Sequence, residues 1–390
     1  MAGNVTDYVK EFGSRPFSDF PMNHVDSLAL CQLAYLKFDG LVPGVRERKP
    51  WVFLRELARN PDYDSLFSDE RYAAENRALL EAMMDGERYR GLRLNDYVNL
   101  VVKEQEMQFS AVTFLLEDGT WYVAYRGTDE TIVGWKEAFN MAFLSPTPGQ
   151  EYSVRYLNMV MGRLGVPFFV GGHSKGGNLA VYAAMNCLGQ IRRRIRGIYN
   201  MDGPGFRPEA QKNDRYENIR EKIIKIVPHS SLIGKLFETG EHCLEVESKA
   251  FALAQHNPYS WQIEGGAFVP APKEQKRGLV EHTVNAWLLT RSTEQMKVFV
   301  DTMYQVVSAA KAEDLIEFAA DWRKNLGIVR AALKTVDEQT RKTLRETLRS
   351  FLKMARLCMK EALTDGKHRP EEPEKPLKPE KPEKPEEVSP

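Results

Sequence analysis

The sequence predicts an α/β fold, in which a mainly parallel sheet carries helices on both faces and further helices lie at both ends of the chain. Between residues 97 and 290, short apolar runs alternate with amphipathic segments, a pattern typical of parallel strands joined by crossover helices. The turn residues Glu117-Asp118-Gly119-Thr120 separate two of these runs and predict a hairpin at the start of the sheet. A later run passes through the glycine-flanked segment 172–176 into a helix-forming segment, as a strand, turn and helix would.

Composition divides the 390 residues into four regions: 1–96, 97–290, 291–365 and 366–390. The first is predicted to be helical and to pack on or cover the core, with Asn23 and Asp26 at capping-box spacing before an apolar helix. The second is the α/β core, and the third is a C-terminal helical region. The last consists almost wholly of Pro, Glu and Lys and is expected to be disordered, because it cannot bury enough apolar surface.

The spacing of apolar residues predicts the positions of the individual strands and helices. Strands are predicted at 97–102, 111–116, 121–125, 166–170, 198–201 and 223–227. Helices are predicted at 135–143, at 152–164, and directly after the 172–176 segment. Two C-terminal helices follow, one from Ser292 and one through 344–357. The second has a basic face, which would suit either a membrane surface or packing on its own domain.

Charge and cysteine content narrow the possible functions. Lys+Arg and Asp+Glu both number 54, so the formal net charge is zero and no nucleic-acid partner is expected. The four cysteines form no C-x-x-C pair and are expected to be reduced and buried. No secretory signal and no apolar run of about 20 residues is visible, which favours a cytoplasmic, soluble protein. No cofactor and no metal are expected, and the sequence does not determine the oligomeric state.

The segment Gly172-His173-Ser174-Lys175-Gly176 fits the Gly-x-Ser-x-Gly pattern of a nucleophile elbow. Its glycines are needed because side chains at 172 and 176 would collide with neighbouring backbone in a sharp turn. The helix that follows would direct backbone N–H groups at the space beside Ser174, where an oxyanion could form. Ser174 is therefore the predicted nucleophile.

A serine nucleophile needs a general base. In folds with such a serine turn, the chain order is Ser, then the acid, then the histidine. His256 is favoured because it lies in a turn-rich segment after the apolar run Phe251-Ala252-Leu253-Ala254, as a histidine on a loop past a strand would. His282, on a predicted helix face, remains the alternative. His173 is expected to point into the packing of the elbow. The other late histidines are less suitable: His229 directly follows a strand, His242 lies in a polar turn and His368 lies in the tail.

Asp202 is the predicted acid because it ends the strand 198–201, at the sheet edge where functional groups gather in open α/β sheets. The alternative is that Asp202 only caps its own Asp202-Gly203-Pro204-Gly205 turn. For the oxyanion, one donor is the backbone N–H of Lys175. Thr128 could supply the second through its N–H or hydroxyl, or it could simply cap a strand-to-helix turn.

These segments resemble class 3 lipases of the α/β-hydrolase superfamily and, more closely, the Mbeg-like family of bacterial lipase-like proteins. The resemblance spans roughly residues 25–300. It rests on Tyr125-Arg126-Gly127-Thr128 followed by Trp135, on the segment 172–180 with its Lys after the serine, on the Asp-Gly-Pro-Gly-Phe turn at 202–206, and on Gln-His-x-Pro-x-Ser-Trp at 255–261. It implies an α/β-hydrolase-type sheet, Ser174 as nucleophile, an oxyanion hole from Thr128 and Lys175, and a late histidine that His256 fits.

One position departs from the class 3 pattern. Those lipases place their acid just after the strand that corresponds to 223–227, where this chain has Pro228-His229-Ser230-Ser231 and no carboxylate. Either Asp202 on the preceding strand has taken over this role, or the triad is incomplete, which would reduce the rate by several orders of magnitude.

Two functions follow from this reading. The first is a serine hydrolase that cleaves an acyl ester or thioester, with a small-molecule or lipid-like substrate in a mainly apolar site. The second is a non-catalytic protein of the same fold that keeps the elbow for packing and acts by binding or regulation.

Overall fold

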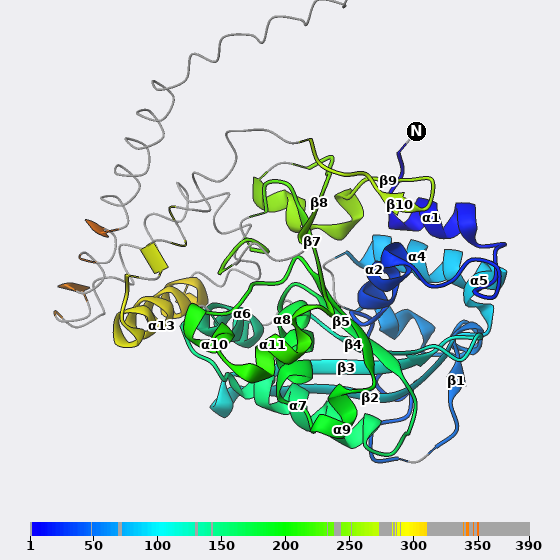
Figure 1. The fold of residues 1–390 in the computed structure, drawn as a ribbon, viewed down its shortest axis with the longest axis horizontal. Helices are drawn as coiled ribbons and strands as arrows, with labels where there is room; N and C mark the ends of the chain where they lie inside the picture. Colours follow the sequence, from blue (N-terminus) through cyan, green and yellow to red (C-terminus); the bar gives the residue numbers. More distant parts are fainter. Residues whose placement is uncertain are drawn as a thin grey trace, which may run out of the picture.

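The computed structural model describes residues 2–47, 49–68, 72–128, 132–141, 143–231, 233–237, 243–250, 252–272 and 290–309, with isolated positions at 283, 285, 287–288 and between 338 and 350. It is an α/β fold built on one mixed, mainly parallel sheet of eight strands, which follow one another across the sheet in chain order (Figure 1). The predicted C-terminal helix at 344–357 and the tail lie outside the described residues, apart from a few positions.

The strands are antiparallel at one side of the sheet and parallel from β4 onward. Their bounds are β1 Val52–Phe53, β2 Arg93–Val102, β3 Met107–Leu115, β4 Trp121–Tyr125, β5 Phe168–His173, β6 Ile195–Met201, β7 Ile223–Pro228 and β8 Cys243–Val246. A hairpin joins β3 to β4 as predicted, with Leu115 paired to Trp121. Two differences from the expected boundaries are that β1 lies in the region predicted to be helical and that β2 begins ahead of residue 97.

The crossover helices cover one face of the sheet. They are α7 Pro148–Met161, α8 Lys175–Asn186 and α11 Asp214–Arg220, and their apolar side chains belong to one buried cluster with Val123 and Tyr125 of β4. Three further helices between the strands are α6 Ile132–Asn140, α9 Gly189–Arg192 and α10 Pro208–Gln211. Because successive side chains of a strand point to opposite faces, Tyr122 and Ala124 face the other way.

The N-terminal helices bury that opposite face. They are α1 Val5–Phe12, α2 His24–Leu33 and α4 Ala73–Asp85, accompanied by α3 Leu54–Leu57, η1 Tyr63–Phe67 and α5 Glu87–Arg90. The predicted capping box at the start of α2 is confirmed: Asn23 accepts from the N–H groups of Val25 and Asp26, and Asp26 accepts from the N–H of Asn23. Figure 1 shows α2 and α4 on the side of the sheet away from α7 and α8.

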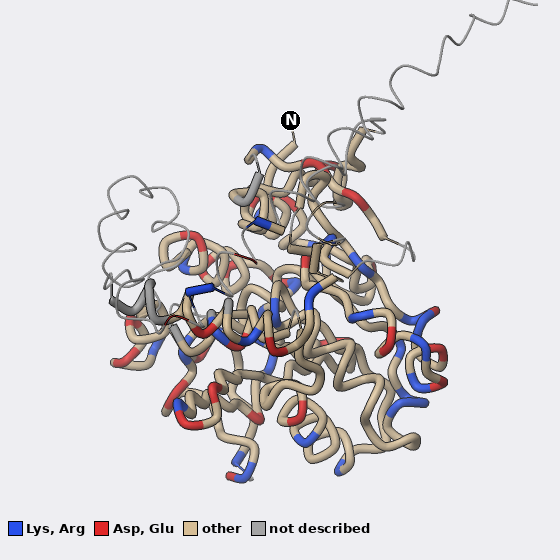
Figure 2. The backbone as a smooth tube through the Cα atoms, turned by 90° about the vertical axis from the view of Figure 1, so that its left-hand side faces the viewer, with Lys and Arg blue, Asp and Glu red and all other residues tan. Residues whose placement is uncertain are grey.

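Most of the remaining elements follow the sheet in the chain. Those that follow β8 are η3 Ala252–His256, η4 Pro258–Ser260, β9 Ile263–Glu264, β10 Ala267–Phe268 and α13 Thr293–Ala309, whereas η2 Lys103–Gln105 lies between β2 and β3 in the chain. In the view of Figure 2, acidic and basic residues are interspersed along the described backbone. Within the described part of the chain, no helix is long and apolar enough to cross a membrane.

Two of the cysteines are buried as expected. Cys31 and Cys187 are buried free thiols, Cys243 is only partly buried, and Cys358 lies outside the described residues. Burial raises the pKa of the Cys31 thiol to about 12 and that of Cys187 to about 11.

Both buried thiols should resist alkylation, because the thiolate is the reactive form. At pH 8 we expect iodoacetamide to modify neither Cys31 nor Cys187 in the folded protein and both in urea, as read by peptide mass spectrometry. Rapid native alkylation of Cys31 would contradict the buried position that the structure gives it.

Candidate active site

Ser174 lies on the sharp turn between β5 and α8, with φ of 59° and ψ of −131°. A positive φ is uncommon for any residue except glycine and marks local backbone strain. The flanking glycines permit the turn: a Cβ at Gly172 would lie 2.3 Å from the backbone carbon of Gly176, and one at Gly176 would lie 2.1 Å from the carbonyl oxygen of Tyr125. The turn thus lifts the Ser174 hydroxyl beyond the carboxyl end of a central parallel strand.

Two side chains complete a hydrogen-bonded chain with Ser174. His256 Nε2 lies 2.8 Å from Ser174 Oγ, and His256 Nδ1 lies 2.6 Å from Asp202 Oδ2. An ionised carboxylate can only accept, so Nδ1 carries the proton and Nε2 is free to accept from the serine hydroxyl. The Asp202 side chain is fully buried, whereas 12% of the His256 side chain is exposed. The imidazole is therefore oriented for proton transfer at the one atom that faces Ser174.

Asp202 does not cap the turn that it opens. The N–H of Gly203 donates to Asn200 Oδ1 at 2.8 Å, and Asn178 on α8 holds the carbonyls of Pro204 and Gly205. The Asp202 carboxylate is used instead by His256 and by the Ser231 hydroxyl, which donates to its second oxygen. The segment after β7, where the class 3 pattern has its acid, thus contributes a hydroxyl.

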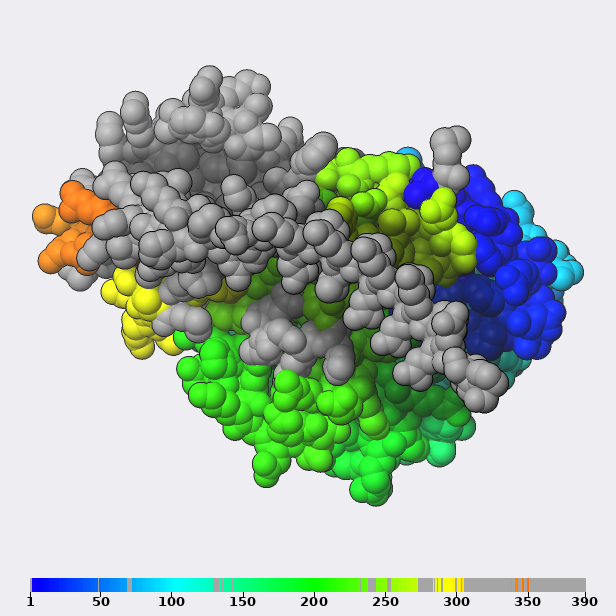
Figure 3. Space-filling model, turned by 45° about the horizontal axis from the view of Figure 1, so that its top comes forward, coloured from blue at the N-terminus to red at the C-terminus, as the bar shows by residue number. Residues whose placement is uncertain are grey.

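The His256 loop is held by contacts from within the loop and from the N-terminal helices. The indole N–H of Trp261, which is fully buried, donates to the Gln255 carbonyl at 2.9 Å. Tyr259 donates to Asn76 on α4 at 2.6 Å, and Gly3 pairs with Ile263 through two backbone hydrogen bonds. Figure 3 shows the 250–270 segment beside the N-terminal helices.

The apolar run before His256 differs from the expectation. A strand would have been followed by a loop, but residues 252–256 form the 3-10 helix η3, and the nearest preceding strand is β8. The expectation of a strand directly before His256 is therefore wrong.

Among the described residues, the other histidines make their contacts elsewhere. His229 Nε2 lies 3.2 Å from the side-chain nitrogen of Gln255. His282, His242 and His368 lie outside the described residues. His173 is buried, and its Nε2 donates to the backbone carbonyl of His256 at 3.0 Å while its Nδ1 lies 3.0 Å from the Tyr35 hydroxyl. His173 thus supports the His256 backbone, a role that the sequence did not predict.

Lys175 points away from solvent into a buried polar cluster. Its ammonium group donates to the carbonyl and the side chain of Gln108 and lies 3.0 Å from the Glu137 carboxylate. Glu137, on α6, also accepts from the N–H groups of Gly149 and Gln108. Both charged side chains are 1% exposed, so the pair is fully desolvated. The cluster fixes the first residue of α8, whose N–H is the predicted oxyanion donor.

Thr128 lies beside the elbow. It follows β4, which pairs in parallel with β5, and a Cβ on the preceding Gly127 would lie 2.7 Å from the carbonyl oxygen of His173. Thr128 is buried, and within the described residues its hydroxyl oxygen has no hydrogen-bond partner. A buried hydroxyl without a partner is costly and needs an explanation, and an incoming ligand oxygen would supply the missing partner.

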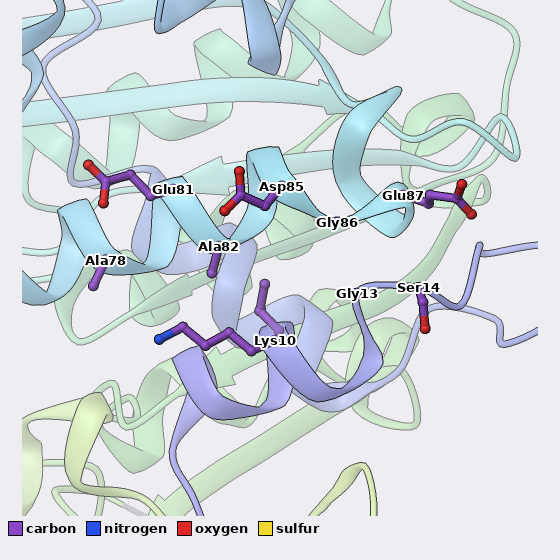
Figure 4. A pocket seen from close by; sticks show the side chains of 10 residues that line it. Lys10, Gly13, Ser14, Ala78, Glu81, Ala82, Asp85, Gly86 and Glu87 are labelled. Atoms are coloured by element: carbon purple, nitrogen blue, oxygen red, sulfur yellow. The ribbon is translucent and has the colours of Figure 1, made fainter.

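The described residues hold no metal-binding cluster, and one described hollow lies away from Ser174. Among the described residues, no group of three or more His, Cys, Asp or Glu side chains could hold a metal ion. A hollow of about 570 Å³ lies between α1 and α4, lined by Lys10, Glu81 and Asp85 among others (Figure 4), and includes none of the residues near Ser174.

Comparison with known proteins identifies the family of this chain. No curated protein and no solved structure matched the chain. The Mbeg1-like family model matches residues 83–305, which is more than half of the chain and includes Ser174, Asp202 and His256. The chain therefore belongs to the Mbeg1-like family.

Proposed function

We propose that the protein is a serine hydrolase that cleaves an acyl ester or thioester through an acyl-enzyme intermediate. The observation that carries the proposal is the unbroken chain of hydrogen bonds from Ser174 through His256 to Asp202, with the serine on a strained turn. A hydroxyl becomes a useful nucleophile when an oriented base can remove its proton, and this arrangement meets that requirement.

In the first half of the reaction, Ser174 Oγ attacks the acyl carbon while His256 Nε2 takes its proton. The Asp202 carboxylate stabilises the imidazolium that forms. The imidazolium then protonates the leaving oxygen or sulfur, and the acyl group stays on Ser174. In the second half, His256 takes a proton from water while the water oxygen attacks the acyl carbon. The bond between Ser174 Oγ and the acyl carbon then breaks, the imidazolium returns the proton to Ser174 Oγ, and the carboxylic acid leaves.

Negative charge on the acyl oxygen needs donors that are already in position. The backbone N–H of Lys175 opens α8 next to Ser174, and the Thr128 hydroxyl lies buried beside the same turn. Donors of this kind contribute most when burial excludes water from the site. The buried pair between Lys175 and Glu137 supports this function by fixing the start of α8.

We also propose membership of the α/β-hydrolase superfamily. Three features support it: the serine turn follows a central parallel strand, the acid follows the next strand, and the base comes later in the chain. The expected substrate is a small acyl ester or a lipid-like molecule, because the proposed chemistry acts on an acyl group.

Replacing Thr128 with valine, which has nearly the same shape but no hydroxyl, tests the second oxyanion donor. We expect kcat to fall by about ten- to a thousandfold with little change in KM, since the hydroxyl acts on charge that develops in the transition state. Steady-state kinetics measure both constants. An unchanged kcat would remove the Thr128 hydroxyl from the mechanism.

Burst kinetics with p-nitrophenyl esters test the proposed function directly. With acetate, butyrate and octanoate esters, we expect a rapid release of about one p-nitrophenolate per protein where deacylation is slow, followed by steady turnover. The Ser174→Ala variant should show neither phase. Folded wild-type protein with no hydrolysis above this variant on any ester or thioester tested would refute the proposal.

A further inference from the structure

We propose that Ser231 is a positioning residue that orients the Asp202 carboxylate for the reaction of Ser174 and His256, an inference that rests on the proposed function. Ser231 follows β7, while Asp202 follows the neighbouring strand β6. No pattern in the sequence links Ser231 to Asp202, because the two residues are far apart in the chain.

The hydrogen bonds around Ser231 show which atom accepts the hydrogen of its hydroxyl group. The N–H of Gly234 donates to Ser231 Oγ at 2.9 Å, so the oxygen is used as an acceptor there. The hydroxyl has a single hydrogen, and an ionised carboxylate can only accept. Ser231 therefore donates to Asp202 Oδ1, while Asp202 Oδ2 accepts from His256 Nδ1.

This contact is enclosed and permits little movement. Ser231 is 2% exposed and Asp202 is fully buried. The loop also lies directly on the carboxylate, because a Cβ at Gly234 would lie 2.1 Å from Asp202 Oδ1. On the other side, the N–H of Asp202 donates to the carbonyl of Ile226 in β7. The two strand ends thus hold the carboxylate at its backbone and at one of its oxygens.

A carboxylate that accepts one charge-assisted bond at each oxygen cannot rotate about its Cβ–Cγ bond without losing both. Fixing Oδ1 therefore fixes Oδ2 opposite His256 Nδ1, and with it the imidazole ring that faces Ser174. The same proximity makes position 231 a second place from which a carboxylate can reach this space. It follows that exchanging the two side chains should preserve part of the activity that loss of the acid removes.

The test uses the full chain, with hydrolysis of the best p-nitrophenyl ester as the readout. We expect Ser231→Ala to lower kcat by about tenfold or more while KM stays near wild type and circular dichroism shows a native fold, and Ser231→Thr to recover part of the loss in kcat. The thermal midpoint of Ser231→Ala should fall, because Asp202 Oδ1 and the N–H of Gly234 lose their buried partner. Ser230→Ala is the matched control. The contact of Ser230 with Gln255 is made by its backbone N–H, so this variant should keep the wild-type rate.

The exchange variant Asp202→Ser/Ser231→Asp is compared with Asp202→Ser alone. At least a tenfold higher kcat in the exchange variant, together with the loss in Ser231→Ala, supports the inference. A wild-type kcat in Ser231→Ala overturns it, as does a correctly folded exchange variant no faster than Asp202→Ser. If circular dichroism shows that the exchange variant is misfolded, the Ser231→Ala and Ser231→Thr rates decide.

If the protein is not a serine hydrolase, the same experiment gives a different result. In that case, wild-type protein itself shows no hydrolysis above Ser174→Ala, whatever residue stands at position 231. If wild-type protein is active and Ser231→Ala keeps the wild-type kcat, only the positioning role of Ser231 is contradicted.

Discussion

His256→Ala should lower kcat for ester hydrolysis by about 10⁴- to 10⁶-fold, the range seen when a serine hydrolase loses its base. The reason is geometric: His256 Nε2 is 2.8 Å from Ser174 Oγ, and the other described histidines make their contacts elsewhere. Asp202→Asn should lower kcat by about 10⁴-fold. An amide can stabilise the wrong tautomer of the His256 imidazole, and it carries no charge to offset the imidazolium.

Steady-state kinetics of purified variants measure these losses. His24→Gln is a suitable control, since His24 lies on α2 against Tyr199 and should leave kcat near wild type. A His256→Ala variant with wild-type kcat would show that another group acts as the base. In that event His282, the alternative from the sequence, is the next residue to replace.

The second large effect concerns stability. Asp26→Ala should lower the free energy of unfolding by about 3–5 kcal/mol, because it leaves the guanidinium of Arg88 buried without its counter-charge. Both side chains are 0% exposed, and two bonds from Arg88 reach the carboxylate at 2.8 and 2.6 Å. Tyr8 and Tyr89 also donate to Asp26, and burial followed by the Asp26 charge raises the pKa of Tyr89 well above its usual value.

Urea denaturation followed by fluorescence measures this loss as a change in midpoint at constant m-value. Asp19→Ala is the control: Asp19 is exposed on the same N-terminal region, so its loss should stay within about 0.5 kcal/mol. If Asp26→Ala lowers the free energy of unfolding by less than about 1 kcal/mol, the contacts of Asp26 with Arg88 and the two tyrosines do not stabilise the N-terminal helices as proposed.

Local patterns in the sequence predicted much of the sheet and the turn at Ser174. Alternation, turn residues and flanking glycines act over a few neighbours, so strands such as 121–125 and 223–227 appear where they were expected. Asp202 could be proposed from its place at a strand end. The capping box at Asn23 was equally visible, since it involves residues three positions apart.

Long-range partners were not predictable in this way. Ser231 reaches Asp202, Glu137 reaches Lys175 and Tyr35 reaches His173 only because the sheet brings distant segments together. The 3-10 helix that ends at His256 was missed because a short apolar run resembles a strand in sequence.

A fluorophosphonate probe tests most directly whether Ser174 is an activated nucleophile. Intact-mass spectrometry of folded wild-type protein should show a single adduct, peptide mapping should place it on Ser174, and Ser174→Ala should take up none. His256→Ala should react far more slowly than wild type, because the serine has lost its base. No adduct on folded wild-type protein, or an adduct that persists in Ser174→Ala, would contradict the proposed role of Ser174.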